Sequence, residues 1–382
     1  MSEARRIAPA EQLPSVELAL GHFQAPMLAA LRAALAQART ESDPDLDDMY
    51  GQIEYHLGWR DADLAEVDAA HLHAGKLLRP SLLLYAAQVA AGVSGVAPTS
   101  PDDVVERATP AAVAVELIHN FSLIHDDIED GDEARRHRPT MWKLWGEAQA
   151  INTGDALFAL ARAQMWGLAE RGVAPAQMIR LGRLLDRACL DICEGQHLDM
   201  RFEGRREVTP DMYLQMIDRK TAALMRCSAE LGARIGAPED EALGDRMATF
   251  GRALGLAFQL RDDMLGVWSA QDLGKTEAGD VRRKKMSLPI IHAIEQANPT
   301  DRRALAEIYA APGPATKAQI ARVLAALEHT GARQHVRDAL REQITRANDA
   351  LAAVVSANAD AGASDAYAAL AGLLAYVGAE AG

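Results

Sequence analysis

The chain has 382 residues, of which 49% are hydrophobic and 25% are charged, and its formal net charge at pH 7 is −14. This hydrophobic content supports a large core, and the acidic balance argues against a nucleic-acid partner. No apolar run reaches the roughly 20 residues of a membrane-spanning helix, and the N-terminus lacks the apolar region of a secretion signal. We therefore expect a cytoplasmic protein without stable membrane insertion.

Helical periodicity dominates the chain from one end to the other. Segments rich in Ala, Leu and Met, with apolar residues at helical spacing, lie at 25–38, 150–169, 177–195 and 248–265. Clusters of Gly and Pro separate such segments, and no long stretch shows the period of two that strands require. The pattern predicts one all-α domain, with residues 1–65 forming an N-terminal helical extension.

The first acidic motif is "DDIED", which comes after the apolar stretch "VELIHNFSLIH". His119, Ser122, Asp126 and Asp130 lie three, four and four residues apart, so on a helix they share one face, with Asp127 about 100° away. Carboxylates aligned on an apolar helix repel one another unless a cation lies between them, and Mg²⁺ prefers such oxygen ligands. The alternative is a solvated charged face.

A second acidic pair lies in "AFQLRDDMLG". Gln259, Asp262, Asp263 and Gly266 again fall on one face of an apolar helix. Metal sites of helical bundles are built from facing helices, so the two motifs could face each other across a bundle and hold metal there. The second pair therefore favours the metal site over the solvated face.

Basic residues accompany both motifs. Lys and Arg suit phosphate oxygens, as point charges and as planar forks respectively. Two anionic groups are therefore predicted, one bound through Mg²⁺ and one held directly, with departure of a phosphate-type leaving group as the chemistry. The candidate basic residues are Lys76, Arg79, Arg135, Arg136, Lys220, Lys275 and Lys285.

Taken together and in this order, the motifs resemble those of the trans-isoprenyl (polyprenyl) diphosphate synthases, most like the geranylgeranyl diphosphate synthases. The resemblance covers residues 70–300 and includes "AGKLLRP", "DDIED" with "RRHRPT", "GQHLD", "KTA" and "FQLRDDMLG". It implies the isoprenoid synthase type I fold, a large helical bundle around a central cavity, with residues 66–382 as the prenyltransferase domain. It also implies a homodimer.

The resemblance implies a role for each motif residue. Three Mg²⁺ ions per active site would be held by Asp126, Asp130, Asp199 and Asp262, supported by Asp127 and Asp263. The allylic diphosphate (dimethylallyl, geranyl or farnesyl) would contact Arg135, Lys220 and Lys275. Isopentenyl diphosphate would be bound by Lys76, Arg79, His119 and Arg136, while Gln196, Thr221, Gln259 and Lys285 would complete the site. The implied reaction is ionisation of the allylic substrate, attack by the double bond of isopentenyl diphosphate, and proton loss.

The chain departs from the family pattern at four positions. Leu77 stands in place of a common arginine, and Gly266 in place of a third aspartate. His137 and Lys284 stand where glycine is usual. None of these changes removes a residue that the mechanism requires, so activity is still expected.

The chain length of the product depends in this family on side chains below the first motif. Phe121, Ser122 and Ile118 lie four to eight residues before Asp126, and one aromatic followed by a serine resembles the pattern of geranylgeranyl (C20) synthases. Phe121 could instead be an ordinary core residue. The remaining alternatives are a farnesyl or longer polyprenyl diphosphate synthase, a class I terpene cyclase, and a non-catalytic subunit of a heteromeric prenyltransferase.

Overall fold

The structure is a computed structural model that describes residues 14–68, 75–94, 101–203, 207–268, 278–354 and 361–379. Its first half contains α1 (Val16–His22), α2 (Gln24–Thr40), the 3₁₀ turn η2 (Pro44–Leu46), α3 (Asp47–His56), α4 (Leu78–Val93), α5 (Pro101–Glu129), β1 (Ala134–Arg135), β2 (Arg138–Pro139), α6 (Met141–Trp145) and α7 (Glu147–Glu170). Its second half contains α8 (Pro175–Phe202), α9 (Pro210–Ile217), the π-helical turn η4 (Asp218–Ala222), α10 (Ala223–Gly236), α11 (Glu241–Trp268), α12 (Gly279–Arg283), α13 (Leu288–Gln296), α14 (Pro299–Ala310), α15 (Lys317–His329), α16 (Ala332–Ala352) and α17 (Ala361–Gly378).

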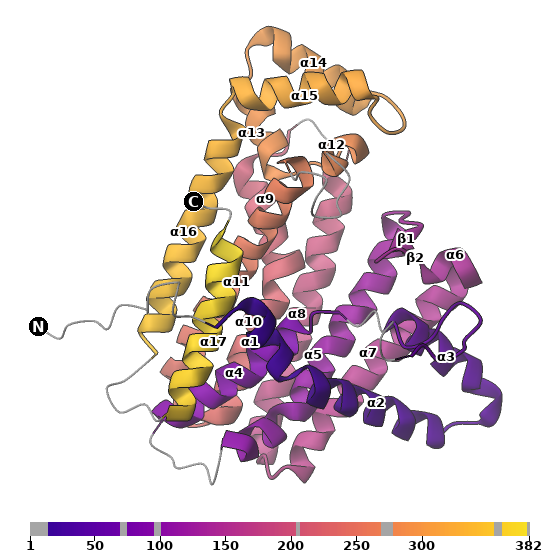
Figure 1. Cartoon of the computed structure of the whole chain (residues 1–382), viewed down its shortest axis with the longest axis vertical. Helices are drawn as coiled ribbons and strands as arrows, with labels where there is room; N and C mark the ends of the chain where they lie inside the picture. The colour runs from indigo at the N-terminus through magenta and orange to yellow at the C-terminus, as the bar shows by residue number, and fades with distance from the viewer. Residues whose placement is uncertain are drawn as a thin grey trace, which may run out of the picture. The chain divides into compact units, whose positions relative to one another are not determined.

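The all-α prediction is confirmed. The four segments with helical periodicity lie in α2, α7, α8 and α11, and within the described ranges the named strands are the two-residue β1 and β2, which form one hairpin (Figure 1). In the same part of the chain, no helix is both long enough and apolar enough to span a bilayer.

Local sequence signals set the starts of several helices. Asn298 accepts hydrogen bonds from the amides of Thr300 and Asp301 at the start of α14, where Pro299 takes the first helical position. Thr316 and Gln319 form a reciprocal capping box at the start of α15. These caps satisfy backbone amides that have no partner within the helix.

The chain divides into two compact units, and neither is continuous in sequence. Unit 1 consists of residues 1–189, 227–248 and 352–373, and unit 2 of residues 190–226, 249–351 and 374–382. The first acidic motif belongs to unit 1 and the second to unit 2. The expected boundary after residue 65 stays a prediction.

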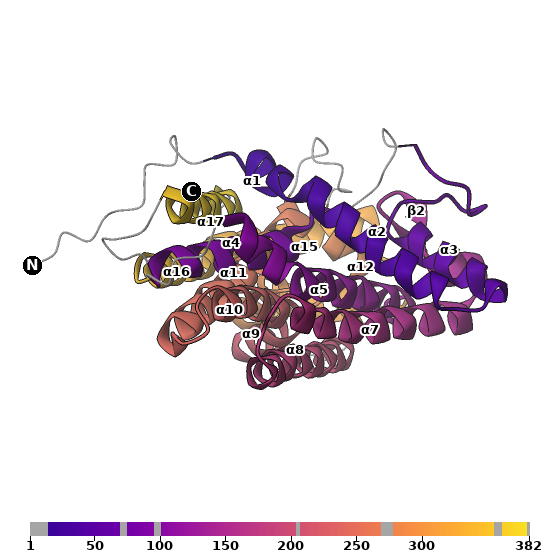
Figure 2. The same ribbon diagram turned by 90° about the horizontal axis from the view of Figure 1, so that it is seen from below.

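In unit 1, α5 and α7 run side by side in opposite directions (Figures 1 and 2). Phe121 of α5 packs on Phe158 of α7 with ring centroids 5.3 Å apart. Nearer the first motif, a Cβ built on Gly154 would lie 2.3 Å from Nε2 of His125. Glycine at this position therefore allows the two helices to approach closely beside the acidic end of α5.

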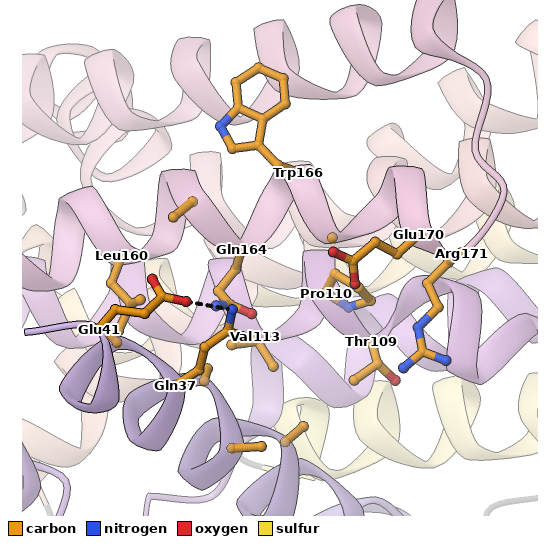
Figure 3. A pocket seen from close by; sticks show the side chains of 16 residues that line it. Gln37, Glu41, Thr109, Pro110, Val113, Leu160, Gln164, Trp166, Glu170 and Arg171 are labelled. Carbon is orange, nitrogen blue, oxygen red and sulfur yellow. Dashed lines mark hydrogen bonds between the residues drawn. The ribbon is translucent and has the colours of Figure 1, made fainter.

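A groove of about 420 Å³ opens on unit 1 between α2, α5 and α7 (Figure 3). Small side chains such as Ala34 and Ala163 line it, together with the hydrogen-bonded pair Gln37 and Glu41. Its α5 residues are Thr109, Pro110 and Val113, so it lies several turns of helix before the first acidic motif.

A close helix crossing also shapes unit 1, where α10 meets α4. A Cβ built on Gly232 would lie 2.1 Å from the carbonyl oxygen of Leu83, and one on Gly236 would lie 2.2 Å from that of Ala87. The backbones are in direct contact along two successive turns. Any side chain at these glycines must push the helices apart.

We predict that Gly232→Ala destabilises the protein by about 1–3 kcal/mol, as overpacking of a tight interior does. Gly182→Ala in α8 is the matched control, because a Cβ at that position meets no atom within 4 Å. In a helix it should be neutral or stabilise by up to about 1 kcal/mol. Thermal unfolding of both variants checks this, and an unchanged Tm for Gly232→Ala would contradict the close crossing.

Candidate active site

The first acidic motif lies where α5 ends. Asp126 is half-buried, Asp127 is 2% exposed, and Asp130 is exposed just beyond the last helical residue. The amide of Asp130 still donates to the carbonyl oxygen of Asp126 at 2.8 Å, as in a helix. Asp126 and Asp130 therefore keep the spacing of one helix face, as the sequence predicted, whereas Asp127 turns inward.

Asp127 is bound by Arg135. Both Nε and Nη2 of Arg135 lie 2.7 Å from Oδ1 of Asp127. Burial raises the pKa of the Asp127 carboxyl, and Arg135 counteracts that shift. Burial lowers the pKa of Arg135, but Asp127 and other nearby carboxylates raise it overall. Asp127 is thus bound to the β1–β2 hairpin through Arg135, whereas Asp126 and Asp130 are less buried than Asp127.

The hairpin that carries Arg135 has an unusual turn. β1 and β2 pair through Arg135 and Arg138, so the loop consists of Arg136 and His137 alone. These two residues have φ of 51° and 63°, in the left-handed region that costs a non-glycine residue about 1–2 kcal/mol. His137 stands where glycine is usual in the family that the sequence resembles. The positive φ explains why glycine suits this position.

Arg79 and His119 meet on the same side of unit 1. Nη1 of Arg79 lies 3.0 Å from Nε2 of His119. Burial, and after it the neighbouring charge of Arg79, holds the pKa of His119 well below its usual range, so the ring is neutral and can accept this hydrogen bond.

Two buried polar residues of α5 that the sequence did not single out support this pair. The amide of Asn120 donates to both the backbone and the side chain of Glu116, at 2.8 and 2.9 Å. Burial raises the pKa of Glu116, although Arg79 and Arg136 lower it. Glu116 is 4% exposed, so it acts as an internal counter-charge for these arginines.

Arg136 reaches toward the segment before α4. A Cβ built on Gly75 would lie 2.9 Å from Nη2 of Arg136, so the guanidinium lies over the backbone next to Lys76. Lys76 itself is exposed, and Leu77 after it has φ of 50°. The structure therefore brings Arg136, Arg79 and His119 together beside the start of α4.

His56, at the end of α3, is a further neighbour of these arginines that the sequence did not reveal. Burial, followed by the charges of Arg136, Arg135 and Arg138, lowers the pKa of His56 to about 3. It lines a cavity of about 30 Å³ with the three arginines. No spacing signal in the sequence links this histidine to a motif about 70 residues later.

The second acidic motif, in unit 2, has the same division between a buried and an accessible aspartate. Asp263 is fully buried, and it accepts a 2.5 Å hydrogen bond from the Tyr213 hydroxyl and a 3.0 Å bond from the Gln259 amide. Burial raises the pKa of Asp263 to about 6. Asp262 is half-buried. Tyr213 was not singled out, because nothing in its spacing relates it to α11.

Thr221 and Lys220 lie in the π-helical turn η4. The Thr221 hydroxyl donates to Oε1 of Gln259 at 2.8 Å, which extends the chain of contacts to Asp263. Nζ of Lys220 lies 2.5 Å from Oδ2 of Asp199. A Cβ on Gly195 would lie 2.2 Å from the Lys220 amide nitrogen, so the glycine of "GQHLD" admits this wide turn.

Gln196 comes directly after that glycine in α8. It is 7% exposed, and among the described residues neither of its amide atoms has a hydrogen-bond partner. A buried amide of this kind requires a hydrogen-bond partner beyond these residues, such as water or a ligand.

Lys285 lies among four carboxylates of unit 2. Burial alone would lower its pKa, but Asp263, Asp280, Asp199 and Asp262 raise it overall. Asp280 is buried, and a Cβ on Gly266 would lie 2.0 Å from its carboxylate. The glycine in place of a third aspartate thus leaves space for Asp280, to which the sequence had assigned no role.

The residues predicted to limit the product length lie on α5. Ile118 is fully buried, while Phe121 and Ser122 are half-buried. The Ser122 hydroxyl donates to the backbone of His119 at 2.9 Å. Lys275, the remaining predicted substrate contact, lies outside the described residues.

Among the described residues, no three His, Cys, Asp or Glu side chains are grouped to hold a metal by themselves. Mg²⁺ in phosphate-transferring sites takes one or two carboxylates and completes its shell with water and substrate phosphates. Asp126 and Asp130 in unit 1, and Asp199 and Asp262 in unit 2, are not fully buried. Within each unit, carboxylates of this kind fit Mg²⁺ bound together with a diphosphate.

A sequence model of the polyprenyl synthetase family matches residues 64–327. The chain is 38% identical over 309 residues to a geranylgeranyl diphosphate synthase of Mycobacterium tuberculosis, covering 78% of this chain and 83% of that protein. It is also 38% identical over 306 residues to a (2E,6E)-farnesyl diphosphate synthase of Mycobacterium bovis, covering 79% of each. The crystal structure of a polyprenyl synthetase from Streptomyces coelicolor superimposes with a TM-score of 0.79 at 36% identity, over 94% of this chain and 99% of that one. The chain therefore belongs to the polyprenyl synthetase family and is a trans-prenyltransferase.

Proposed function

We propose that the protein condenses isopentenyl diphosphate with an allylic diphosphate in an Mg²⁺-dependent reaction and releases geranylgeranyl diphosphate. The observation that carries the proposal is the design common to both acidic motifs. Each pairs a buried aspartate, compensated by a cation, with an accessible one: Asp127 with Arg135 beside Asp126, and Asp263 with Lys285 beside Asp262. Accessible carboxylates next to fixed cations suit a metal-bound diphosphate.

The allylic diphosphate is assigned to the acidic motifs and their cations. Asp126, Asp130, Asp199 and Asp262 would hold three Mg²⁺ ions, which supply charge neutralisation for the departing diphosphate. Arg135, Lys220 and Lys275 would contact its oxygens. Lys220 is held 2.5 Å from Asp199, so its ammonium group is oriented in advance.

Isopentenyl diphosphate is assigned to the basic group of unit 1. Arg79, His119 and Arg136 lie together there, with Gly75 bringing Lys76 beside Arg136. The neutral His119 orients Arg79, and Glu116 offsets part of the positive charge of Arg79 and Arg136. These residues would hold the second substrate so that its double bond can attack the allylic carbocation, and proton loss completes the reaction.

The product length is proposed as C20. The relatives at the same level of identity carry both geranylgeranyl and farnesyl names, so similarity alone does not choose between them. Phe121 supports a limited chain length, because its ring lies five residues before Asp126 and is braced by Phe158 at 5.3 Å. Ser122 beside it is small, which favours C20 over a shorter product.

A homodimer is proposed on the basis of exposed apolar side chains in unit 1. Trp166 and Ile151 on α7 are 63% and 45% exposed, and Ile179 on α8 is 58% exposed. Trp166 and Ile179 lie close together on the two helices, and neighbouring exposed apolar side chains of this kind are typical of a protein–protein contact. Sedimentation velocity of the wild type and of Trp166→Lys tests this assignment.

Incubation with radiolabelled isopentenyl diphosphate and dimethylallyl, geranyl or farnesyl diphosphate, followed by chromatography, tests the function directly. The expected product is C20 in each case, only with Mg²⁺ present. A cyclic hydrocarbon from farnesyl diphosphate alone would show a terpene cyclase instead. Inert protein that stimulates a second prenyltransferase chain would show a non-catalytic subunit.

We predict that Asp126→Ala lowers kcat by at least about 100-fold, the size of effect seen when an electrostatic group of an active site is removed. The fold should be retained, because Asp126 is only half-buried. Glu129→Ala is the matched control: this exposed acid lies three residues later and should leave kcat within about twofold. Steady-state kinetics with Mg²⁺ and circular dichroism distinguish the two. Activity of Asp126→Ala close to wild type would exclude the metal role.

We also predict that Phe121→Ala lengthens the product by one or more isoprene units, because it removes the ring next to Phe158. Phe23→Ala, at a 3% exposed aromatic between α1 and α2, controls for loss of stability. It should lower Tm without changing the product. Chromatography of the dephosphorylated products measures chain length, and an unchanged length for Phe121→Ala would place the floor of the cavity elsewhere.

A further inference from the structure

The β1–β2 turn contains two successive non-glycine residues with positive φ, and the hairpin around it carries both Arg135 and Arg136. Two-residue hairpin turns with positive φ at both positions prefer Asn and Gly, whereas this turn contains Arg136 and His137. A lone two-stranded hairpin is also only marginally stable. Contacts outside the hairpin must therefore hold the turn in this conformation.

Arg138 and Tyr55 provide these contacts. Arg138 donates from Nη1 to the carbonyl oxygen of Tyr55 at 3.0 Å and from Nη2 to that of Arg60. Its guanidinium carbon also lies 3.9 Å from the centroid of the Tyr55 ring. The Tyr55 hydroxyl donates to the carbonyl oxygen of Pro139 at 2.7 Å. Both residues of β2 are thus fastened to the end of α3 and the segment after it.

The Tyr55 side of this contact is rigid. Tyr55 is 3% exposed, and its ring packs edge-on against Trp145 of α6 at 5.0 Å. At the other end of the hairpin, Thr140 and Trp142 both donate to the carbonyl oxygen of Asp132 at 2.8 Å. Hydrogen bonds therefore hold the hairpin both at β2 and at its ends, so the turn between the strands is supported.

The arginines of the hairpin point to different places. Arg135 binds Asp127, whereas Arg136 reaches Gly75 beside Lys76. Arg138 differs from both, because its two terminal nitrogens are engaged by backbone carbonyls and its face is covered by a ring. Arg138 is therefore suited to hold the hairpin rather than to contact a substrate.

We propose that Tyr55 and Arg138 are positioning residues that hold the Arg136–His137 turn in its unfavourable conformation, so that Arg136 is presented to isopentenyl diphosphate. This inference rests on the proposed function, which assigns Arg136 to that substrate. It also gives α3, within the predicted N-terminal extension, a role in substrate binding.

The test compares Arg138→Leu, Arg138→Lys and Tyr55→Phe in the full chain. Arg138→Leu should raise KM for isopentenyl diphosphate at least about tenfold, with kcat reduced less than about threefold and KM for the allylic substrate changed less than about threefold. Arg138→Lys should behave like Arg138→Leu, because an ammonium group keeps the charge but cannot span both carbonyl oxygens. Tyr55→Phe should raise the same KM about threefold.

The decisive variant adds His137→Gly to Arg138→Leu. Glycine adopts positive φ without strain, so the double variant should recover at least about threefold of the lost KM. Recovery by Arg138→Lys but not by His137→Gly would overturn the proposal, since it would mean that the charge of Arg138 acts directly on substrate. A wild-type KM for Arg138→Leu would also overturn it.

Hydrogen exchange separates this inference from the proposed function. The Thr140 amide donates to the carbonyl oxygen of Glu133 at 3.0 Å, and in Arg138→Leu it should exchange at least about tenfold faster, with recovery in the double variant. The amide of Ile320, bonded to Thr316, should not change. Arg234→Leu, which breaks ion pairs with Glu230 and Asp245 elsewhere in unit 1, controls for general loss of stability and should leave KM and Thr140 unchanged. If the wild type proves inactive, unchanged exchange at Thr140 in Arg138→Leu would still overturn the positioning role of Arg138.

Discussion

Compensation of buried negative charge is the constraint on which both acidic motifs depend. A carboxylate in a helix wall loses its hydration, so it must be given a cation or hydrogen-bond donors. Asp127 receives Arg135, whereas Asp263 receives Tyr213, Gln259 and the nearby ammonium group of Lys285. The protein itself therefore compensates the inner aspartates, and in the proposed function the metal role falls to the less buried aspartates beside them.

This arrangement has a consequence for the cations. Arg135 and Lys220 are each held in one position by a carboxylate, Asp127 and Asp199 respectively. A cation that is already oriented loses less freedom when a diphosphate arrives, so its contribution to stabilising the leaving group is larger. Asp127 therefore serves to orient a basic side chain, whereas Asp199 orients Lys220 and is also assigned to metal in the proposed function.

Sequence periodicity and spacing predicted the all-α class and the helices that carry both motifs. They also predicted that Asp126 and Asp130 share a face. Asp126 lies in α5, and Asp130 is the first residue after α5 and still donates to the carbonyl oxygen of Asp126. They did not predict Tyr213, Asp280 or His56, because each meets its motif through tertiary contacts between distant segments. The backbone at His137 and Lys284 was also not predicted, although both stand where glycine is usual and both have positive φ. Residue identity alone does not reveal a conformation that the residue disfavours.

Because η4 is a π-helical turn, the contacts of this segment with α11 depend on its number of residues as well as on their identity. Tyr213 lies in α9 before this turn and Thr221 lies within it, and they reach Asp263 and Gln259, which are one turn apart on α11. Each residue added to or removed from a helix rotates the remainder of that helix by about 100°. A deletion that converted η4 into ordinary α-helix would break this paired contact even if every side chain were kept. Relatives that vary in this region should therefore differ by substitution, with insertions and deletions confined to the connection before α9.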